Sequence, residues 1–311
     1  MSGEGDLIAR LRGLATHPAA RSLLDDAAVL PAPLGRDLVL THDMLVAGVH
    51  FLPDCPAGDV AWKLLAVNLS DLAAKGATPI GVLMGYGLTG DTAWDAAFVD
   101  GLARALAHFD VPLLGGDTVA QPKGDARVLG LTAIGQALAG GAPDRRGAKP
   151  GDHLWVTGPI GDAGLGLRIA LGEIEGPRRL LKAYRLPMPR LAFGRTIAPH
   201  VSAMADVSDG LLIDARRIAD ASGLAVTIDL ATVPLSDEAR TLGLAPLTAA
   251  TAGDDYQLLF ASSSAEIERI AAEQRVPIAC VGRFDQGSGL TIVDNGGPVA
   301  LPTSLGWEHG A

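Results

Sequence analysis

The chain has 311 residues, 48% of them hydrophobic and 19% charged, as in an ordinary globular protein, and its length favours two compact lobes. Its 35 acidic and 25 basic side chains give a net charge of −10, which argues against a nucleic-acid partner because that class of partner needs a basic surface. The N-terminus does not resemble a signal peptide, and no apolar run is long enough to span a bilayer. We therefore expect a cytoplasmic protein with two reduced cysteines and no membrane partner.

In the first half of the chain, apolar runs alternate with helical patterns. Strands are predicted at residues 38–40, 79–88, 111–114 and 128–137, and helices at residues 58–74 and 91–109. The first strand leads into Thr41-His42-Asp43, and the third leads into Gly115-Gly116-Asp117-Thr118. Polar side chains are thus expected to gather where strands end.

A segment rich in Gly, Pro and Arg, residues 140–151, indicates a change of lobe, and we place the boundary between residues 140 and 141. The elements predicted beyond it are strands at 153–157, 203–205, 226–230, 256–261, 278–284 and 290–293, and helices at 163–171, 211–221 and 265–274. Both lobes mix strands with helices. The predicted fold class is therefore α/β or α+β in two parts, residues 1–140 and 141–311.

One glycine-rich motif is set aside. Residues 85–90 fit G-x-G-x-x-G between a predicted strand and a predicted helix, as in dinucleotide-binding proteins. Asp91, at the start of that helix, is better explained as an N-cap, and its charge would oppose a pyrophosphate there. The chain contains neither a G-x-x-x-x-G-K-[ST] loop nor the protein-kinase signatures, so we do not expect either of those enzyme classes.

Aspartates beside Gly, Ser or Thr recur near the ends of the predicted elements. They lie in Asp25-Asp26, Thr41-His42-Asp43, Asn68-Leu69-Ser70-Asp71, Gly116-Asp117-Thr118, Asp206-Val207-Ser208-Asp209-Gly210 and Gly253-Asp254-Asp255. Each alone is equally well explained by a cap or a turn, although Asp71 lies among apolar helix neighbours and needs a partner. As a set they match Mg²⁺, which takes oxygen ligands, and an acidic protein that binds a nucleotide needs such cations.

Seven segments resemble the thiamine-monophosphate kinase family, in the family's order and over nearly the whole chain. They are residues 25–30, 41–51, 63–77, 115–118, 147–152, 206–211 and 253–256. The resemblance implies an aminoimidazole ribonucleotide synthetase-like fold, with an N-terminal sheet lobe that forms a barrel with its twin in a homodimer and a C-terminal α/β lobe. It also implies ATP-dependent phosphorylation of thiamine monophosphate to thiamine diphosphate, with several Mg²⁺ ions.

The resemblance assigns roles to individual positions. Those that resemble metal-binding positions are Asp26, Thr41, His42, Asp43, Asp71, Asp117, Asp206 and Asp209. Those that resemble ATP contacts are Gly116, Asp117, Arg145 and Ser208. Those that resemble substrate contacts are His50, Asp254 and Trp307. No catalytic general base is expected, because a phosphate monoester with a second pKa of about 6 is already largely dianionic at neutral pH.

The chain departs from the family pattern at three places. Leu24 stands where the family usually has Gly, and Thr41-His42-Asp43 where it has Ser-Thr-Asp. The family's Gly-Gly-Asp/Glu-Asp-Tyr-Glu-Leu is Ala252-Gly253-Asp254-Asp255-Tyr256-Gln257-Leu258 in this chain. Arg145 is adjacent to Arg146, and either could be the nucleotide contact.

Several side chains also have an ordinary structural interpretation. His50 could be a buried, hydrogen-bonded histidine, Trp307 could cover a core, and the role of His42 stays open. Lys63 is interpreted as a charge on a helix face. The competing functions are another ATP-using enzyme of the same superfamily and a non-catalytic nucleotide-binding protein.

Overall fold

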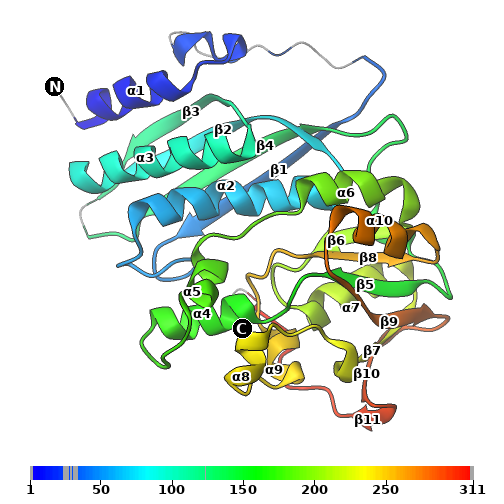
Figure 1. Ribbon diagram of the computed structural model, residues 1–311. Coiled ribbons are helices and arrows are strands. Elements are labelled where there is room, and N and C mark those ends of the chain that lie inside the picture. The colour runs from blue at the N-terminus through cyan, green and yellow to red at the C-terminus, as the bar shows by residue number, and fades with distance from the viewer. Residues whose placement is uncertain (1–2, 24–27, 29, 31–33, 123, 309–311) are drawn as a thin grey trace. The chain divides into compact units, whose positions relative to one another are not determined.

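The computed structural model describes residues 3–23, 28, 30, 34–122 and 124–308 (Figure 1). The chain forms two compact units. The first contains the described residues up to Leu72 and Thr78–Ala139, and the second contains Ala73–Ala77 and the chain from Gly140 onward. Each unit has a sheet of its own.

The sheet of the first unit has the strand order β1-β4-β2-β3. The strands are β1 (Leu38–Val46), β2 (Thr78–Leu88), β3 (Leu113–Ala120) and β4 (Val128–Gln136), and the helices are α1 (Gly3–Leu14), the 3-10 helix η1 (Pro18–Leu23), α2 (Ala57–Ala74) and α3 (Thr92–Phe109). β4 is antiparallel to β1 and β2, whereas β2 and β3 are parallel. Helices α2 and α3 cover one face of this sheet (Figure 1).

Both polar segments that were predicted to follow strands lie inside strands. β1 continues through Val46 because its ladder with β4 is unbroken from Leu38 opposite Gln136 to Val46 opposite Val128. Likewise, Gly115-Gly116-Asp117-Thr118 is part of β3. Successive side chains of a strand point to opposite faces, so neighbours in these segments are separated rather than grouped.

The second unit contains a mixed seven-stranded sheet with the order β11-β10-β7-β9-β5-β8-β6. The strands are β5 (His153–Thr157), β6 (Ala203–Asp206), β7 (Ala225–Asp229), β8 (Leu258–Ser262), β9 (Ile278–Asp285), β10 (Gly289–Asp294) and β11 (Gly297–Val299). β10 and β7 are parallel, and the other pairs are antiparallel.

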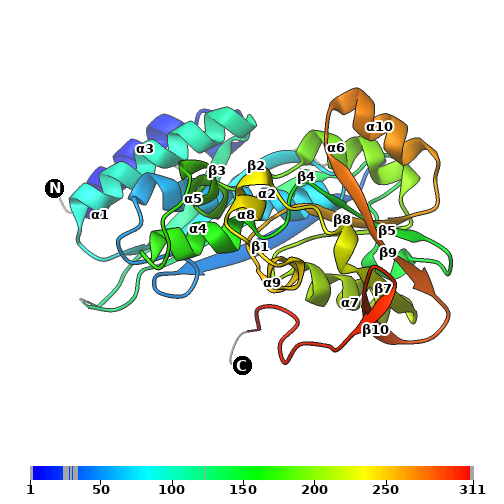
Figure 2. The same ribbon diagram turned by 60° about the horizontal axis from the view of Figure 1, so that its bottom comes forward.

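Helices pack on both faces of this second sheet (Figure 2). The helices and 3-10 helices of this unit are η2 (Arg145–Gly147), α4 (Asp162–Ala170), α5 (Arg178–Arg185), α6 (Leu191–Ile197), η3 (Ala198–His200), α7 (Leu211–Ser222), η4 (Leu230–Thr232), α8 (Asp237–Thr241), α9 (Pro246–Thr251) and α10 (Glu266–Gln274). On one face α7 and α9 share a core with Ala203 and Ala205 of β6. On the other face α6 and α10 pack with Met204, as the alternation of a strand requires.

None of the helices that the structure describes is both long and apolar enough to cross a bilayer.

A buried carboxylate fixes the start of α4. Asp255 lies just before β8, and its side chain accepts hydrogen bonds from the backbone N–H groups of Gly161, at 2.8 Å, and Ala163, at 3.4 Å. Burial raises the pKa of Asp255 well above its ordinary value, although the two backbone hydrogen bonds act in the opposite direction. The folded chain therefore binds this proton more tightly than the unfolded chain does.

This pKa shift predicts a pH-dependent stability. Because the folded-state pKa of Asp255 is raised, the unfolded state loses the proton first, and the contribution of Asp255 to stability falls as pH rises above about 4. Asp255→Asn stays neutral and keeps one acceptor for Gly161, so it should be at least as stable as the wild type at pH 7. The difference should shrink toward pH 4, as measured by urea denaturation at several pH values.

The exposed Asp294→Asn serves as the control and should show no such trend. A pH-independent difference between Asp255→Asn and the wild type would contradict the raised pKa.

Candidate functional site

Three of the predicted metal-binding positions are associated with helix α2 in the first unit. Thr41 and Asp43 lie on the face of β1 that α2 covers, and the hydroxyl of Thr41 donates a hydrogen bond to Oδ2 of Asp71 on α2. The backbone N–H of Asp43 donates to Oδ1 of Asn68 at 3.1 Å. Asn68 is fully buried and donates in turn to the carbonyl of Leu64, at 3.0 Å. The amide of Asn68 thus ties β1 to α2 beside the two carboxylates.

His42 lies on the opposite face of the same strand. Its Nδ1 is 2.8 Å from Oγ1 of Thr132 on β4, and the ring is exposed. The imidazole is therefore not grouped with Thr41 and Asp43.

Gly116 and Asp117, on edge strand β3, line a cavity of about 720 Å³ within the first unit. Most of its other walls are apolar, and they include Leu11, Leu83 and Leu114. Glycine is required at 116 because a Cβ there would lie 2.0 Å from the carbonyl oxygen of Met84. The cavity thus combines an apolar interior with one predicted metal ligand.

His50 is held in one tautomer by the backbone. Its Nδ1 accepts a hydrogen bond from the N–H of Val46 at 3.1 Å, so a neutral ring has its proton on Nε2. Lys63 donates to the backbone carbonyl of His50 at 3.1 Å and is only 2% exposed. Lys63 lies on a face of α2, as predicted for a helix-face charge, but its ammonium is buried and bonded to the segment that contains His50.

In the second unit, the predicted metal-binding residues lie on the turn between β6 and α7. Asp206 ends β6 and is buried, and Asp209 precedes α7. Oδ2 of Asp214, in the first turn of α7, accepts the backbone N–H groups of Ser208 at 3.1 Å, Asp209 at 3.1 Å and Gly210 at 3.2 Å. A single buried carboxylate oxygen therefore sets the path of the backbone through this turn.

Arg217 connects the same carboxylate to a predicted metal ligand. Its Nη1 donates to Oδ2 of Asp209 at 2.5 Å and to Oδ1 of Asp214 at 2.8 Å. Burial raises the pKa of Asp214, and the backbone hydrogen bonds and Arg217 act in the opposite direction. Sequence reasoning missed both residues, although their positions four and seven residues after Gly210 of the Asp-Gly pair place them on one side of the following helix.

Two distant segments bind to the backbone of the β6–α7 turn. The N–H of Asp254 donates to the carbonyl of Ser208 at 2.7 Å, and the N–H of Trp307 donates to the carbonyl of Asp209 at 2.8 Å. Trp307 is preceded by Gly306, where a Cβ would lie 2.4 Å from the same Asp209 oxygen. Five of the predicted positions, Asp206, Ser208, Asp209, Asp254 and Trp307, are thereby brought to one region of the second unit.

The loop that carries Asp254 is strained. Asp254 and Tyr256 have φ angles of 67° and 49°, in the left-handed region that residues other than glycine rarely adopt. The hydroxyl of Tyr256 donates to Oδ1 of Asp254 at 3.0 Å, and the N–H of Tyr256 donates to the carbonyl of Val207 at 2.8 Å. These contacts hold the Asp254 carboxylate in a defined position, as is common at binding sites.

The structure distinguishes the two adjacent arginines. Arg146 forms an ion pair with Asp144, with its Nε 3.0 Å and its Nη2 2.6 Å from the carboxylate of Asp144. Arg145 is exposed, and its backbone carbonyl accepts from Ser222. Arg145 is therefore the better candidate for a ligand contact.

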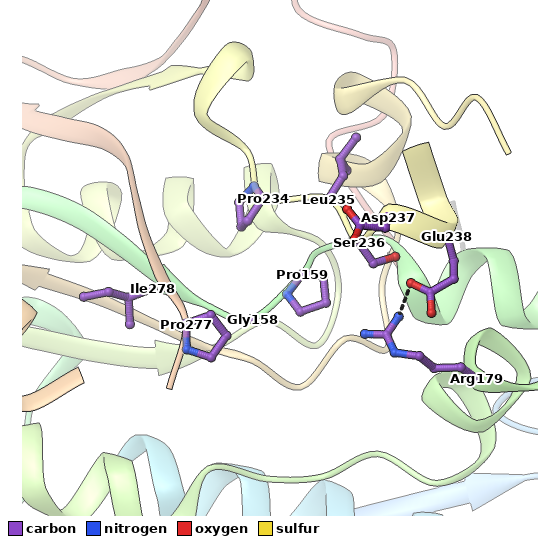
Figure 3. A pocket seen from close by; sticks show the side chains of 10 residues that line it. All are labelled: Gly158, Pro159, Arg179, Pro234, Leu235, Ser236, Asp237, Glu238, Pro277 and Ile278. Atoms are coloured by element: carbon purple, nitrogen blue, oxygen red, sulfur yellow. Dashed lines mark hydrogen bonds and ion pairs between the residues drawn. The ribbon is translucent and has the colours of Figure 1, made fainter. Parts of the chain in front are cut away.

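A second cavity, of about 390 Å³, lies in the second unit between the loops that precede α8 and β9 (Figure 3). Arg179 and Glu238 face each other at one side of it, with 3.0 Å between Nη1 and Oε2. Its lining contains none of the predicted site residues.

The donor atoms fit Mg²⁺. Within the described ranges, no three His, Cys, Asp or Glu side chains are close enough to hold one ion together, and Asp26 lies outside those ranges. Mg²⁺ usually takes only one or two carboxylates and completes its shell with water and substrate phosphates. Asp43 and Asp71, beside the Asn68 amide, and Asp206 and Asp209, on the β6–α7 turn, offer carboxylates of that kind.

Comparisons with known proteins agree with the fold and the motifs. Residues 24–137 match the family model "AIR synthase related protein, N-terminal domain", and residues 149–295 match the corresponding C-terminal domain. The thiamine-monophosphate kinase of Caulobacter vibrioides is 44% identical, with 99% of this chain and 91% of that protein covered. The enzyme of Salmonella typhimurium is 38% identical, with 92% and 90% covered.

Solved structures of thiamine-monophosphate kinases are also similar to this chain. The thiamine-monophosphate kinase of Stenotrophomonas maltophilia K279a superposes with a TM-score of 0.83 at 35% identity, covering 94% of this chain and 96% of that one. A structure described as AaThiL complexed with AMPPCP and TMP gives a TM-score of 0.77 at 28% identity, covering 90% and 89%. The predicted two-lobed, aminoimidazole ribonucleotide synthetase-like fold is confirmed, whereas the dimer barrel stays a prediction. The chain belongs to the thiamine-monophosphate kinase family.

Proposed function

We propose that this protein transfers the γ-phosphoryl group of ATP to the phosphate of thiamine monophosphate, forming thiamine diphosphate and ADP. The main support is the convergence of Asp254 and Trp307 on the backbone of the turn that contains Asp206 and Asp209. That turn offers carboxylates for phosphate-bound cations beside a carboxylate and an aromatic ring suited to a cationic heterocycle. The relative described with both AMPPCP and TMP supports the same pair of substrates.

We assign the metal-binding role to the carboxylates and oxygens of both units. The proposed residues are Asp26, Thr41, His42, Asp43, Asp71, Asp117, Asp206 and Asp209, with His42 acting through its backbone. Several Mg²⁺ ions, when bound, offset the charge of the two polyanionic substrates. The Thr41 hydroxyl orients Asp71, and Asn68 fixes the backbone of Asp43, so these donor groups are arranged before ligands arrive.

For ATP, we propose contacts from Gly116, Asp117, Arg145 and Ser208. The apolar cavity beside Gly116 and Asp117 is large enough for a nucleobase, and Asp117 lies in its wall. The exposed guanidinium of Arg145 suits a phosphate oxygen, since its neighbour Arg146 is already paired with Asp144.

For thiamine monophosphate, we propose contacts from His50, Asp254 and Trp307. A neutral His50 ring is a donor at Nε2 and suits a phosphate oxygen. Asp254 suits the positive charge or the amino group of thiamine. The indole of Trp307 is about half exposed and can stack against the cationic thiazolium ring.

The chemical step needs positioning more than proton transfer. The attacking phosphate is largely dianionic at neutral pH, so no side chain has to remove a proton from it. The chain's own contribution is to align the monophosphate oxygen with the γ-phosphorus and to exclude competing geometries. No covalent phosphoenzyme forms in this scheme.

A second copy of the chain is the proposed macromolecular partner. On β1, the sheet face that α2 does not cover presents Leu38, Leu40 and Met44, which are 47%, 62% and 51% exposed. A row of exposed apolar side chains on a sheet favours association with another sheet.

We also propose a cytoplasmic location, in keeping with the thiol state of Cys55 and Cys280.

A coupled ATP-consumption assay with thiamine monophosphate, thiamine and aminoimidazole precursors tests the proposed reaction. ADP should accumulate with thiamine monophosphate, accompanied by thiamine diphosphate, and not with the other acceptors. Turnover with an aminoimidazole precursor instead would assign the chain to a different reaction of the superfamily.

The first site prediction concerns Asp71. Asp71→Asn keeps an oxygen that accepts from Thr41 but loses the negative charge, so kcat should fall by at least about 100-fold while the melting temperature changes little. Steady-state kinetics at saturating Mg²⁺ provide the measurement. Asp100→Asn, an exposed carboxylate on α3, is the matched control. Near-normal turnover of Asp71→Asn would remove Asp71 from the metal-binding set.

The second site prediction concerns Trp307. Trp307→Ala removes the aromatic face and should raise KM for thiamine monophosphate by about 5- to 30-fold, as expected for loss of a partly desolvated cation–π contact. KM for ATP should change little. Trp307→Phe keeps a ring and should restore most of the affinity. An unchanged KM for thiamine monophosphate in Trp307→Ala would exclude Trp307 from the substrate site.

A further inference from the structure

Asp214 and Arg217 of α7 contact the β6–α7 turn at both its backbone N–H groups and the Asp209 side chain. Asp214 holds the backbone N–H groups of three successive residues, 208 to 210, on one oxygen. Arg217 holds Oδ2 of Asp209 and the second oxygen of Asp214. The side chain of Asp214 is 2% exposed, and that of Arg217 is 38% exposed.

Arg217 orients the Asp209 carboxylate by holding one of its two oxygens, Oδ2, and it does not neutralise both. The guanidinium is 2.5 Å from Oδ2, so its donor is directed at one oxygen of the pair. Carboxylates that bind metals are commonly hydrogen-bonded in this way, with one oxygen on a fixed donor and the other on the ion. The contact therefore restricts rotation of the carboxylate while Oδ1 can face a cation.

The same turn also supports the other two segments of the proposed site. The carbonyls of Ser208 and Asp209, whose N–H groups Asp214 holds, accept the N–H groups of Asp254 and Trp307. A change in the turn would thus displace the two proposed substrate contacts together with Asp209.

We propose that Asp214 and Arg217 are positioning residues that orient the Asp206–Gly210 turn for divalent-cation binding. This inference rests on the proposed function, because it assigns the cation to Asp206 and Asp209. Neither residue touches substrate in this scheme. Asp214 acts through the backbone of the turn, and Arg217 acts through the side chain of Asp209.

The test measures Mn²⁺ binding to the full-length chain by electron paramagnetic resonance, without nucleotide, and then the Mg²⁺ concentration that gives half-maximal turnover. Asp214→Asn loses one anionic oxygen, and Arg217→Gln loses the charge that orients Asp209. Both should weaken Mn²⁺ binding by about 10- to 100-fold and shift the Mg²⁺ requirement upward by a similar factor. Arg217→Lys should recover part of the loss.

Arg216→Gln is the matched control. Arg216 is the preceding residue on α7 and pairs with Asp220 at 3.4 Å, away from the turn, so its substitution should leave Mn²⁺ binding unchanged. Thermal unfolding in chelator reports on folding. If Asp214→Asn does not fold, Arg217→Gln and Arg217→Lys decide the question, because the arginine is less buried.

The outcomes separate this inference from the function on which it rests. A wild-type chain that neither binds Mn²⁺ nor requires Mg²⁺ for turnover would overturn the proposed metal role and the inference with it. A wild-type chain that binds Mn²⁺, with Asp214→Asn and Arg217→Gln binding equally well, would overturn the inference alone. An equal loss in Arg216→Gln would also overturn it, since the effect would then not depend on contact with the turn.

Discussion

The shape of the β6–α7 turn, and with it the proposed site of the second unit, depends on one interaction, the convergence of three backbone N–H groups on a single oxygen of Asp214. An N–H group at a helix start has no partner within the helix, and a carboxylate in the first turn both satisfies it and is favoured by the helix dipole. Here the carboxylate belongs to Asp214 in the first turn of α7, so the turn that precedes α7 folds back onto that helix. The outward-facing carbonyls of Ser208 and Asp209 are then available to Asp254 and Trp307.

Aspartates of both proposed metal-binding regions are held by neighbouring hydrogen-bond donors. The chain has a formal charge of −10, and its proposed substrates are anionic as well. Neighbouring carboxylates repel each other when no cation is bound, and in that state each needs a hydrogen-bond donor. Thr41 supplies one for Asp71, and Arg217 supplies one for both Asp209 and Asp214. These donors stabilise the arrangement of the carboxylates.

Sequence patterns predicted the mixture of strands and helices in two parts and the family, because periodicity and motif order are local properties. They did not predict that Thr41 and His42 would lie on opposite faces, since the strand that contains them is extended by pairing with β4, a partner more than eighty residues away. They also did not predict that the helix-face charge Lys63 would be buried, with its ammonium bonded to the carbonyl of His50. Long-range pairing of this kind is not encoded in any one segment.

The same alternation explains which departures from the family pattern are tolerated. At position 41, threonine keeps the hydroxyl that serine would offer to Asp71. At position 42, the side chain faces away from α2 toward Thr132, so histidine can replace threonine without entering the site. At position 257, Oε1 of glutamine accepts from Thr157 at 2.8 Å and from Arg190 at 3.1 Å, as a carboxylate oxygen would. The replacements at 41 and 257 preserve the donor or acceptor that the fold uses, and the replacement at 42 changes a side chain that contacts Thr132 on the other face of the sheet.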